Sequence, residues 1–129
     1  MRDTFHDLET WSPRNLKHGT HQYAEQAEVM LWGYALEHEP AKVWDVVNGR
    51  VHWEDDLSGL WESCATPGMP TDLERLLRED ENLVWFQNGG HFDFVVLKHA
   101  MPKAAGMIST HRRRDTMVQA SAASFFVCC

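Results

Sequence analysis

The chain has 129 residues, of which 43% are hydrophobic and 24% are charged, so it is long enough for one domain and has the composition of a soluble globular protein. No apolar run approaches the ~18 residues that a membrane span needs, and the first residues lack the apolar stretch of a signal peptide. The three cysteines form neither a disulfide framework nor a paired zinc motif. We therefore expect a cytoplasmic protein with no membrane partner.

The net charge of −7 is distributed unevenly along the chain. Residues 1–97 hold seven Lys or Arg against 18 Asp or Glu, whereas residues 98–129 hold five against one. An acidic body with a basic strip at residues 111–114 fits a metal-dependent nuclease, in which cations bring in the phosphate. It fits equally an acidic protein with a solvated basic segment, so charge alone leaves both interpretations open.

The first half of the chain predicts strands. Thr4–Glu9 is predicted to form a short one. The nearly continuous apolar run Glu28–Leu36 indicates a buried central strand. Lys42–Val47 predicts another, which the tight-turn pair Asn48-Gly49 connects to a strand at Arg50–Trp53. These strands would form an antiparallel meander.

The second half predicts helix, strand and helix in turn. Cys64–Pro70 is typical of a loop, and Thr71 could cap a helix that runs to Arg78. Asn82–Phe86 is predicted to be a short buried strand, and His91–Ala100 has helical spacing. Residues 115–120 could begin a further helix. Together the elements predict an α/β domain with a mixed sheet flanked by helices.

The sharpest local feature is Asp7-Leu8-Glu9. On a strand, residues i and i+2 point to the same face, so the two carboxylates would lie side by side. They would repel each other unless a cation lay between them, and Mg²⁺ and Mn²⁺ prefer such oxygen ligands. The same pattern is also common at the ends of strands that bind no metal.

A second feature is the segment Asn88–Asp93, which follows a predicted strand and contains two glycines. The glycines allow a sharp turn, and Asp93 would then fall in the first turn of a helix, where an anion is favoured. The alternative interpretation is structural: Asp93 caps the helix and Asn88 closes the turn.

These two motifs, in this order and at this spacing, resemble a known family. Asp7-Leu8-Glu9-Thr10 is similar to the first motif of the DEDD 3′→5′ exonucleases, and Asn88–Asp93 is similar to the second. The intervening sequence resembles the exonuclease portion of phage-type family A DNA polymerases, and the resemblance covers residues 3 to about 120. The further segments that carry it are Leu16–Ala24, Glu28–Leu36, Lys42–Asp45 and Arg114–Val118.

The resemblance implies a ribonuclease H-like fold and a proofreading activity that removes nucleotides one by one from a single-stranded DNA 3′ end. It also implies two divalent cations, Mg²⁺ or Mn²⁺, one of which activates the attacking water. Asp7 would bridge the two ions, Glu9 would bind the first, and Asp93 would hold the second.

Three further residues take roles from the same resemblance. Thr10 and Asn88 would position the 3′-terminal nucleotide, and Phe92 would pack beneath the site. A polymerase domain that normally follows such a domain in the same chain would be its partner.

The end of the chain departs from the family. No Tyr, Asp or Glu follows Asp115, so the last carboxylate motif of the family has no counterpart. We therefore expect residues 1–120 to be a partial exonuclease domain and residues 121–129 to be an atypical tail, with weak activity, marginal stability and one sheet face partly uncovered. Two alternatives stay open: a stand-alone exonuclease completed by a second subunit, and an inactive remnant that binds only nucleic acid or a protein partner.

Other residues have a functional and a structural interpretation. His91 could act as a ligand or base, or face solvent. His18 and His21 have zinc-like spacing but lack a third ligand. The arginines of residues 111–114 could bind phosphate or be solvated, and Trp44 could stack on a base or pack in the core.

Overall fold

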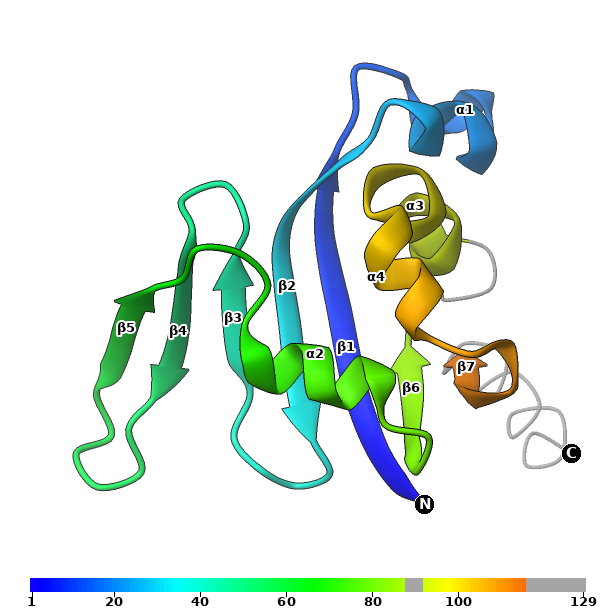
Figure 1. The fold of residues 1–129 in the computed structure, drawn as a ribbon. Coiled ribbons are helices and arrows are strands. Elements are labelled where there is room, and N and C mark those ends of the chain that lie inside the picture. Colours follow the sequence, from blue (N-terminus) through cyan, green and yellow to red (C-terminus); the bar gives the residue numbers. More distant parts are fainter. Residues whose placement is uncertain (88–91, 116–129) are drawn as a thin grey trace, which may run out of the picture.

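A seven-stranded mixed sheet crosses the molecule in the order β5-β4-β3-β2-β1-β6-β7 (Figure 1). The computed structural model describes residues 1–87 and 92–115. The strands are β1 Arg2–Trp11, β2 Glu28–Leu36, β3 Lys42–Asp45, β4 Arg50–Glu54, β5 Trp61–Ala65, β6 Asn82–Phe86 and β7 Arg113–Asp115. β1 through β5 form an antiparallel meander, whereas β6 and β7 continue the sheet on the other side of β1 in parallel orientation.

The helices are short. They are α1 Thr20–Glu25, α2 Thr71–Arg78, α3 Phe94–Ala100 and α4 Pro102–Met107, with single 3₁₀ turns at Leu16–His18 and Thr110–Arg112. In Figure 1, α2 crosses in front of β1 and β2, α3 and α4 lie beside β1 near the end of β6, and α1 lies beside α3 near the end of β1. Within the described ranges, no helix is long and apolar enough to cross a membrane.

Side chains alternate strictly along β1. Thr4, His6 and Leu8 are buried beneath the helices, whereas Phe5 and Asp7 are exposed on the opposite face. The helix-side residues join a core that is built mainly from β2, β6, α2 and α3. Its largest fully buried apolar side chains are Trp32, Phe86, Leu73, Leu77 and Leu97. The core therefore lies on one face of the sheet.

The other face carries no helix among the residues that the structure describes (Figure 1). Phe5, at the centre of this face, keeps 42% of its surface exposed. Ala35 lies directly opposite Phe5 on β2, and Trp85 opposite it on β6. Within the described residues, the expected uncovered sheet face is thus present.

Several predicted elements are confirmed. The strands Glu28–Leu36 and Asn82–Phe86 have the predicted bounds, and the predicted helix that ends at Arg78 is present as α2. The α/β architecture with a mixed sheet is also confirmed. Trp44 packs in the core with 5% of its surface exposed, and its ring lies 6.2 Å from that of Trp32.

Other predictions are wrong. The predicted loop from Cys64 begins within β5, an edge strand whose side chains are all exposed and therefore show no alternation. Thr71 is the first residue of α2 rather than its cap, because Pro70 holds the cap position without a side-chain hydrogen bond. The short helices α1 and α4, each of six residues, were not predicted.

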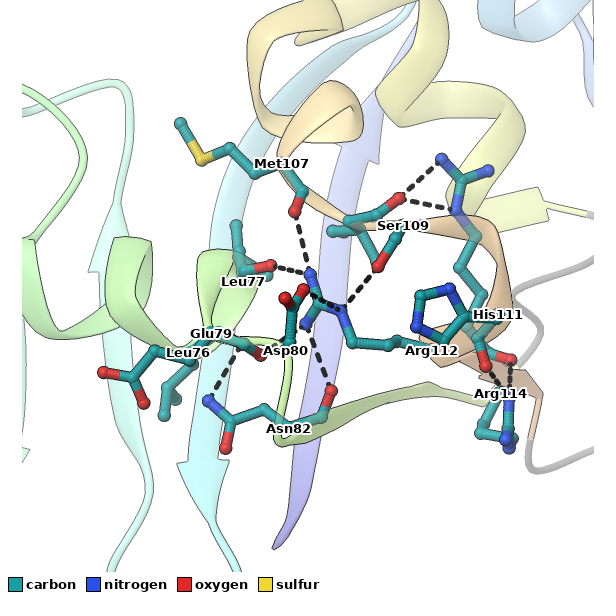
Figure 2. Close-up of polar contacts among 12 residues, drawn as sticks. Leu76, Leu77, Glu79, Asp80, Asn82, Met107, Ser109, His111, Arg112 and Arg114 are labelled. Carbon is teal, nitrogen blue, oxygen red and sulfur yellow. Dashed lines mark hydrogen bonds and ion pairs between the residues drawn. The ribbon is translucent and has the colours of Figure 1, made fainter. Parts of the chain in front are cut away.

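The interpretation of residues 111–114 as a solvated or phosphate-binding strip is wrong for Arg112, which keeps only 1% of its surface exposed. Its guanidinium donates to the carbonyls of Leu77 (2.6 Å) and Glu79 (2.9 Å) at the C-terminal end of α2 (Figure 2). It also donates to the carbonyls of Met107 (2.9 Å), at the end of α4, and Asn82 (3.1 Å), at the start of β6. Arg112 thus joins three elements of the core.

Candidate metal and nucleic-acid site

Asp7 and Glu9 lie on the open face of β1. In the regular antiparallel ladder with β2, Asp7 is opposite Gly33 and Glu9 is opposite Leu31. The register shifts only after Glu9, so the two side chains share one face, with an axial separation of about 7 Å between their backbone positions. Both are exposed, whereas Leu8 between them is buried. The predicted same-face arrangement is therefore confirmed.

Gly33 leaves room beside Asp7. A methyl group at this glycine would meet only the backbone carbonyl oxygen of Asp7, at 3.8 Å. Neighbouring packing therefore does not require a glycine here. Its effect is that the strand residue opposite Asp7 contributes no side chain, which leaves this carboxylate accessible to a hydrated ion or a phosphate.

Tyr23 of α1 connects the end of β1 to the start of α3. Its hydroxyl is hydrogen-bonded to the hydroxyl of Thr10 at 2.9 Å, and its ring lies 5.6 Å from that of Phe92. Ser12 holds the same segment by donating to the Tyr23 carbonyl at 2.8 Å. Thr10 and Phe92, both predicted to lie at the site, are thus brought together by a residue that the sequence analysis did not single out.

Asp93 immediately precedes α3, on the helix side of the sheet. The Phe94 ring packs against Phe86 at 5.1 Å, and Phe86 lies 5.2 Å from His6 on the buried face of β1. Asp93 keeps 4% of its surface exposed and already takes part in an interaction within the chain. It makes no side-chain capping hydrogen bond, because its backbone is helical.

The predicted ligands therefore divide into two places. Asp7 and Glu9 share the open face of β1, whereas the helix that begins after Asp93 packs on the other face of the same strand. Among residues 1–87 and 92–115, no group of three or more His, Cys, Asp or Glu side chains is placed to hold a metal ion. His18 and His21, whose spacing is zinc-like, therefore belong to no such group among these residues.

A network of buried hydrogen bonds lies on the face of β1 opposite to Asp7. Trp32 donates from Nε1 to Nδ1 of His6 at 3.0 Å. Because an indole nitrogen can only donate, Nδ1 is unprotonated, and the remaining proton of the neutral ring is on Nε2. His6 then donates from Nε2 to Thr4 Oγ1 (2.9 Å), which donates to the Leu83 carbonyl (2.7 Å). This network fixes the middle of β1 against β2 and β6.

Burial lowers the pKa of His6 from its ordinary value of 6.5 to about 3. The hydrogen bonds are consistent with this shift, since a proton on Nδ1 would face the N–H of Trp32. His6 is therefore a neutral structural residue, and it is not available as a proton donor beside Asp7 at neutral pH.

The chemistry of the donor set suits a hard divalent cation. Asp7 and Glu9 offer only carboxylate oxygens, the ligands that Mg²⁺ and Mn²⁺ prefer, and their exposure leaves space for coordinated water. Two carboxylates that share a face also gain from a cation between them. These two residues fit a metal site that a substrate phosphate would complete.

Some predicted site residues lie outside the described residues. They include Asn88, predicted to position the terminal nucleotide, and His91, together with the proposed tail at residues 121–129. Comparison of the chain with protein-family models, with curated proteins and with solved structures finds no match.

Proposed function

We propose that the chain is a metal-dependent 3′→5′ exonuclease module that hydrolyses phosphodiester bonds at single-stranded DNA 3′ ends, as in proofreading during replication. The observation that carries the proposal is the exposed pair Asp7 and Glu9 on one face of the central strand. The contact of Tyr23 with both Thr10 and Phe92 supports it, because the surroundings of two distant motifs meet there. The mixed sheet is compatible with a ribonuclease H-like fold.

In this proposal Asp7 and Glu9 hold one divalent cation on the open face of β1, and Asp93, which is buried on the helix side of the sheet, takes no part in binding it. When bound, the cation would supply Lewis-acid stabilisation and a metal-activated water. Phe92 packs against Tyr23 and fixes the start of α3, while the Thr10 hydroxyl is directed by its bond to Tyr23. The chain itself would thus orient the terminal nucleotide between the end of β1 and the start of α3.

The test is degradation of a 5′-labelled single-stranded DNA by the purified chain in Mn²⁺. We expect a ladder of progressively shortened products. Asp7→Asn should slow its formation by about tenfold to a hundredfold, because the substitution removes the charge of a proposed metal ligand.

Asp3→Asn provides the matched control. Asp3 lies on the same face of the same strand, and its Oδ1 accepts from Trp85 Nε1 at 3.0 Å, a bond that asparagine retains. Asp3→Asn should degrade DNA at the rate of the unmodified chain. A ladder that forms at the unmodified rate in Asp7→Asn, or that is slowed equally in Asp3→Asn, would contradict the proposed role of Asp7.

The second candidate is an inactive fold that binds only nucleic acid or a protein partner. The burial of Asp93, together with its existing interaction, favours this candidate, because a ligand must be accessible to its ion. In that case the purified chain should leave the labelled DNA intact in both Mn²⁺ and Mg²⁺.

A further inference from the structure

A cleft of about 410 Å³ lies beside α3, on the helix side of the sheet. Its lining includes Phe94, the residue that directly follows Asp93, and Lys98, one helical turn further along α3. His21 of α1 borders it, two residues before Tyr23. The cleft is therefore lined by α1 and α3. α1 contains Tyr23, and α3 begins just after Phe92, so both helices lie next to the contacts that Tyr23 makes near the end of β1.

The lining of this cleft is basic in a protein whose net charge is −7. Lys98, Arg113 and Arg114 bring three permanent positive charges, against the one carboxylate of Asp115. The acidic majority of the chain therefore contributes little to this surface. Such a local concentration of positive charge attracts a polyanion.

Two of the cationic groups are held in place. Arg113 donates from Nη2 to the carbonyls of Ala105 (3.2 Å) and Ile108 (3.1 Å), and its guanidinium carbon lies 5.0 Å from the centre of the Phe94 ring. Arg114 donates to the His111 carbonyl at 2.8 Å. Charges that are already ordered lose less conformational freedom on binding. Lys98 is exposed and forms no ion pair with another described residue.

We propose that this cleft binds the sugar–phosphate backbone of the single strand whose 3′ end the module processes. That the bound polyanion is DNA rests on the proposed function. That the cleft binds a chain of phosphates at all rests on the positive charges of Lys98, Arg113 and Arg114. Because Arg113 covers Phe94, the lining offers cations rather than an open aromatic face, so binding depends on phosphates and tolerates any base sequence.

The test measures binding of a short fluorescein-labelled oligothymidylate by fluorescence anisotropy, with EDTA present, over a range of salt concentrations. Lys98→Gln should weaken binding roughly fivefold, the effect of an exposed ion pair near the upper end of its usual range. It should also reduce the slope of log affinity against log salt by about 0.7, the loss of one phosphate contact on a single strand.

Lys103→Gln is the matched control, because Lys103 is an equally exposed lysine on α4 and does not line this cleft. It should change neither the affinity nor the slope. The proposal is overturned if the unmodified chain does not bind the oligonucleotide, if Lys98→Gln binds like the unmodified chain, or if both variants weaken binding equally.

The assay contains no metal, so its outcome is separate from that of the proposed function. Binding that depends on Lys98, without DNA degradation, would support the proposed DNA-binding cleft and contradict the proposed exonuclease activity. Degradation that depends on Asp7, with binding that does not depend on Lys98, would support the exonuclease activity and contradict the cleft as its DNA-binding site.

Discussion

Replacing Arg112 with methionine should lower the free energy of unfolding by about 3–5 kcal/mol, because several buried carbonyl oxygens lose their hydrogen-bond donor at once. Since small domains are stable by only about 5–15 kcal/mol, the variant should melt at a much lower temperature or lose cooperative unfolding. Circular dichroism during urea and thermal unfolding measures the effect.

The reason is the set of acceptors around the guanidinium (Figure 2). The carbonyls of Leu77 and Met107 belong to the last turns of α2 and α4, whose final carbonyls have no partner within their own helix. A cation there also interacts favourably with both helix dipoles. Without Arg112 these buried oxygens lose their donors, and each unsatisfied group costs roughly 1–3 kcal/mol.

The nearest carboxylate contributes little to this arrangement. Asp80 lies 3.9 Å from Arg112 Nε, and 93% of its side chain is exposed. Hydrogen bonds to the carbonyl oxygens, rather than an ion pair, therefore stabilise the buried charge. Arg112→Lys should lower the free energy of unfolding nearly as much as Arg112→Met, because an ammonium group cannot reproduce the planar set of donors of a guanidinium.

Arg114→Met is the control for the loss of one arginine, since Arg114 is half-buried and, among the described residues, its side chain donates only to the nearby carbonyls of His111 and Arg113. It should cost less than about 1 kcal/mol. Equal stabilities for Arg112→Met and Arg114→Met would show that the buried network contributes nothing.

The second large effect is a loss of stability in mild acid that originates at His6. Because the folded pKa of about 3 lies below the ordinary value of 6.5, the unfolded chain binds one more proton between these limits. The contribution of neutral His6 is fully present above pH 6.5 and decreases as the pH falls toward 3. The expected slope is about 1.4 kcal/mol per pH unit, or roughly 2 kcal/mol lost by about pH 5.

The measurement is urea unfolding between about pH 7 and pH 5, on the unmodified chain and on His6→Gln. Glutamine does not titrate in this range, and its amide can accept one hydrogen bond and donate another. The variant should be less stable at neutral pH and should lack the steep part of the pH dependence. Parallel pH profiles for the two proteins would show that His6 does not cause the acid sensitivity.

The sequence predicted the elements that carry their own apolar pattern. Glu28–Leu36 is a buried central strand, and the apolar side of α2 repeats at helical spacing, so each could be located by itself. α1 and α4 have only six residues each, too few for a clear period. β5 is an edge strand defined by its pairing with β4 rather than by its own side chains.

The candidate site was predictable only in part for the same reason. The same-face placement of Asp7 and Glu9 follows from strand geometry alone. The position of Asp93 depends on how α3 packs, and the contact of Tyr23 with Thr10 and Phe92 joins three separate segments. The burial of Arg112 depends on where two helices end, which three consecutive arginines in a sequence do not reveal.

The central claim is that Asp7 and Glu9 share one divalent cation on the open face of β1, and Mn²⁺ titration of the ¹⁵N-labelled protein, followed by NMR, tests it most directly. We predict that the amide signals of residues 7–9 and of residues 31–33 on the paired strand broaden first, that excess Mg²⁺ restores them, and that Asp7→Asn abolishes the effect. Broadening that is spread evenly over the acidic surface, or that is unchanged in Asp7→Asn, would contradict a metal site at this pair.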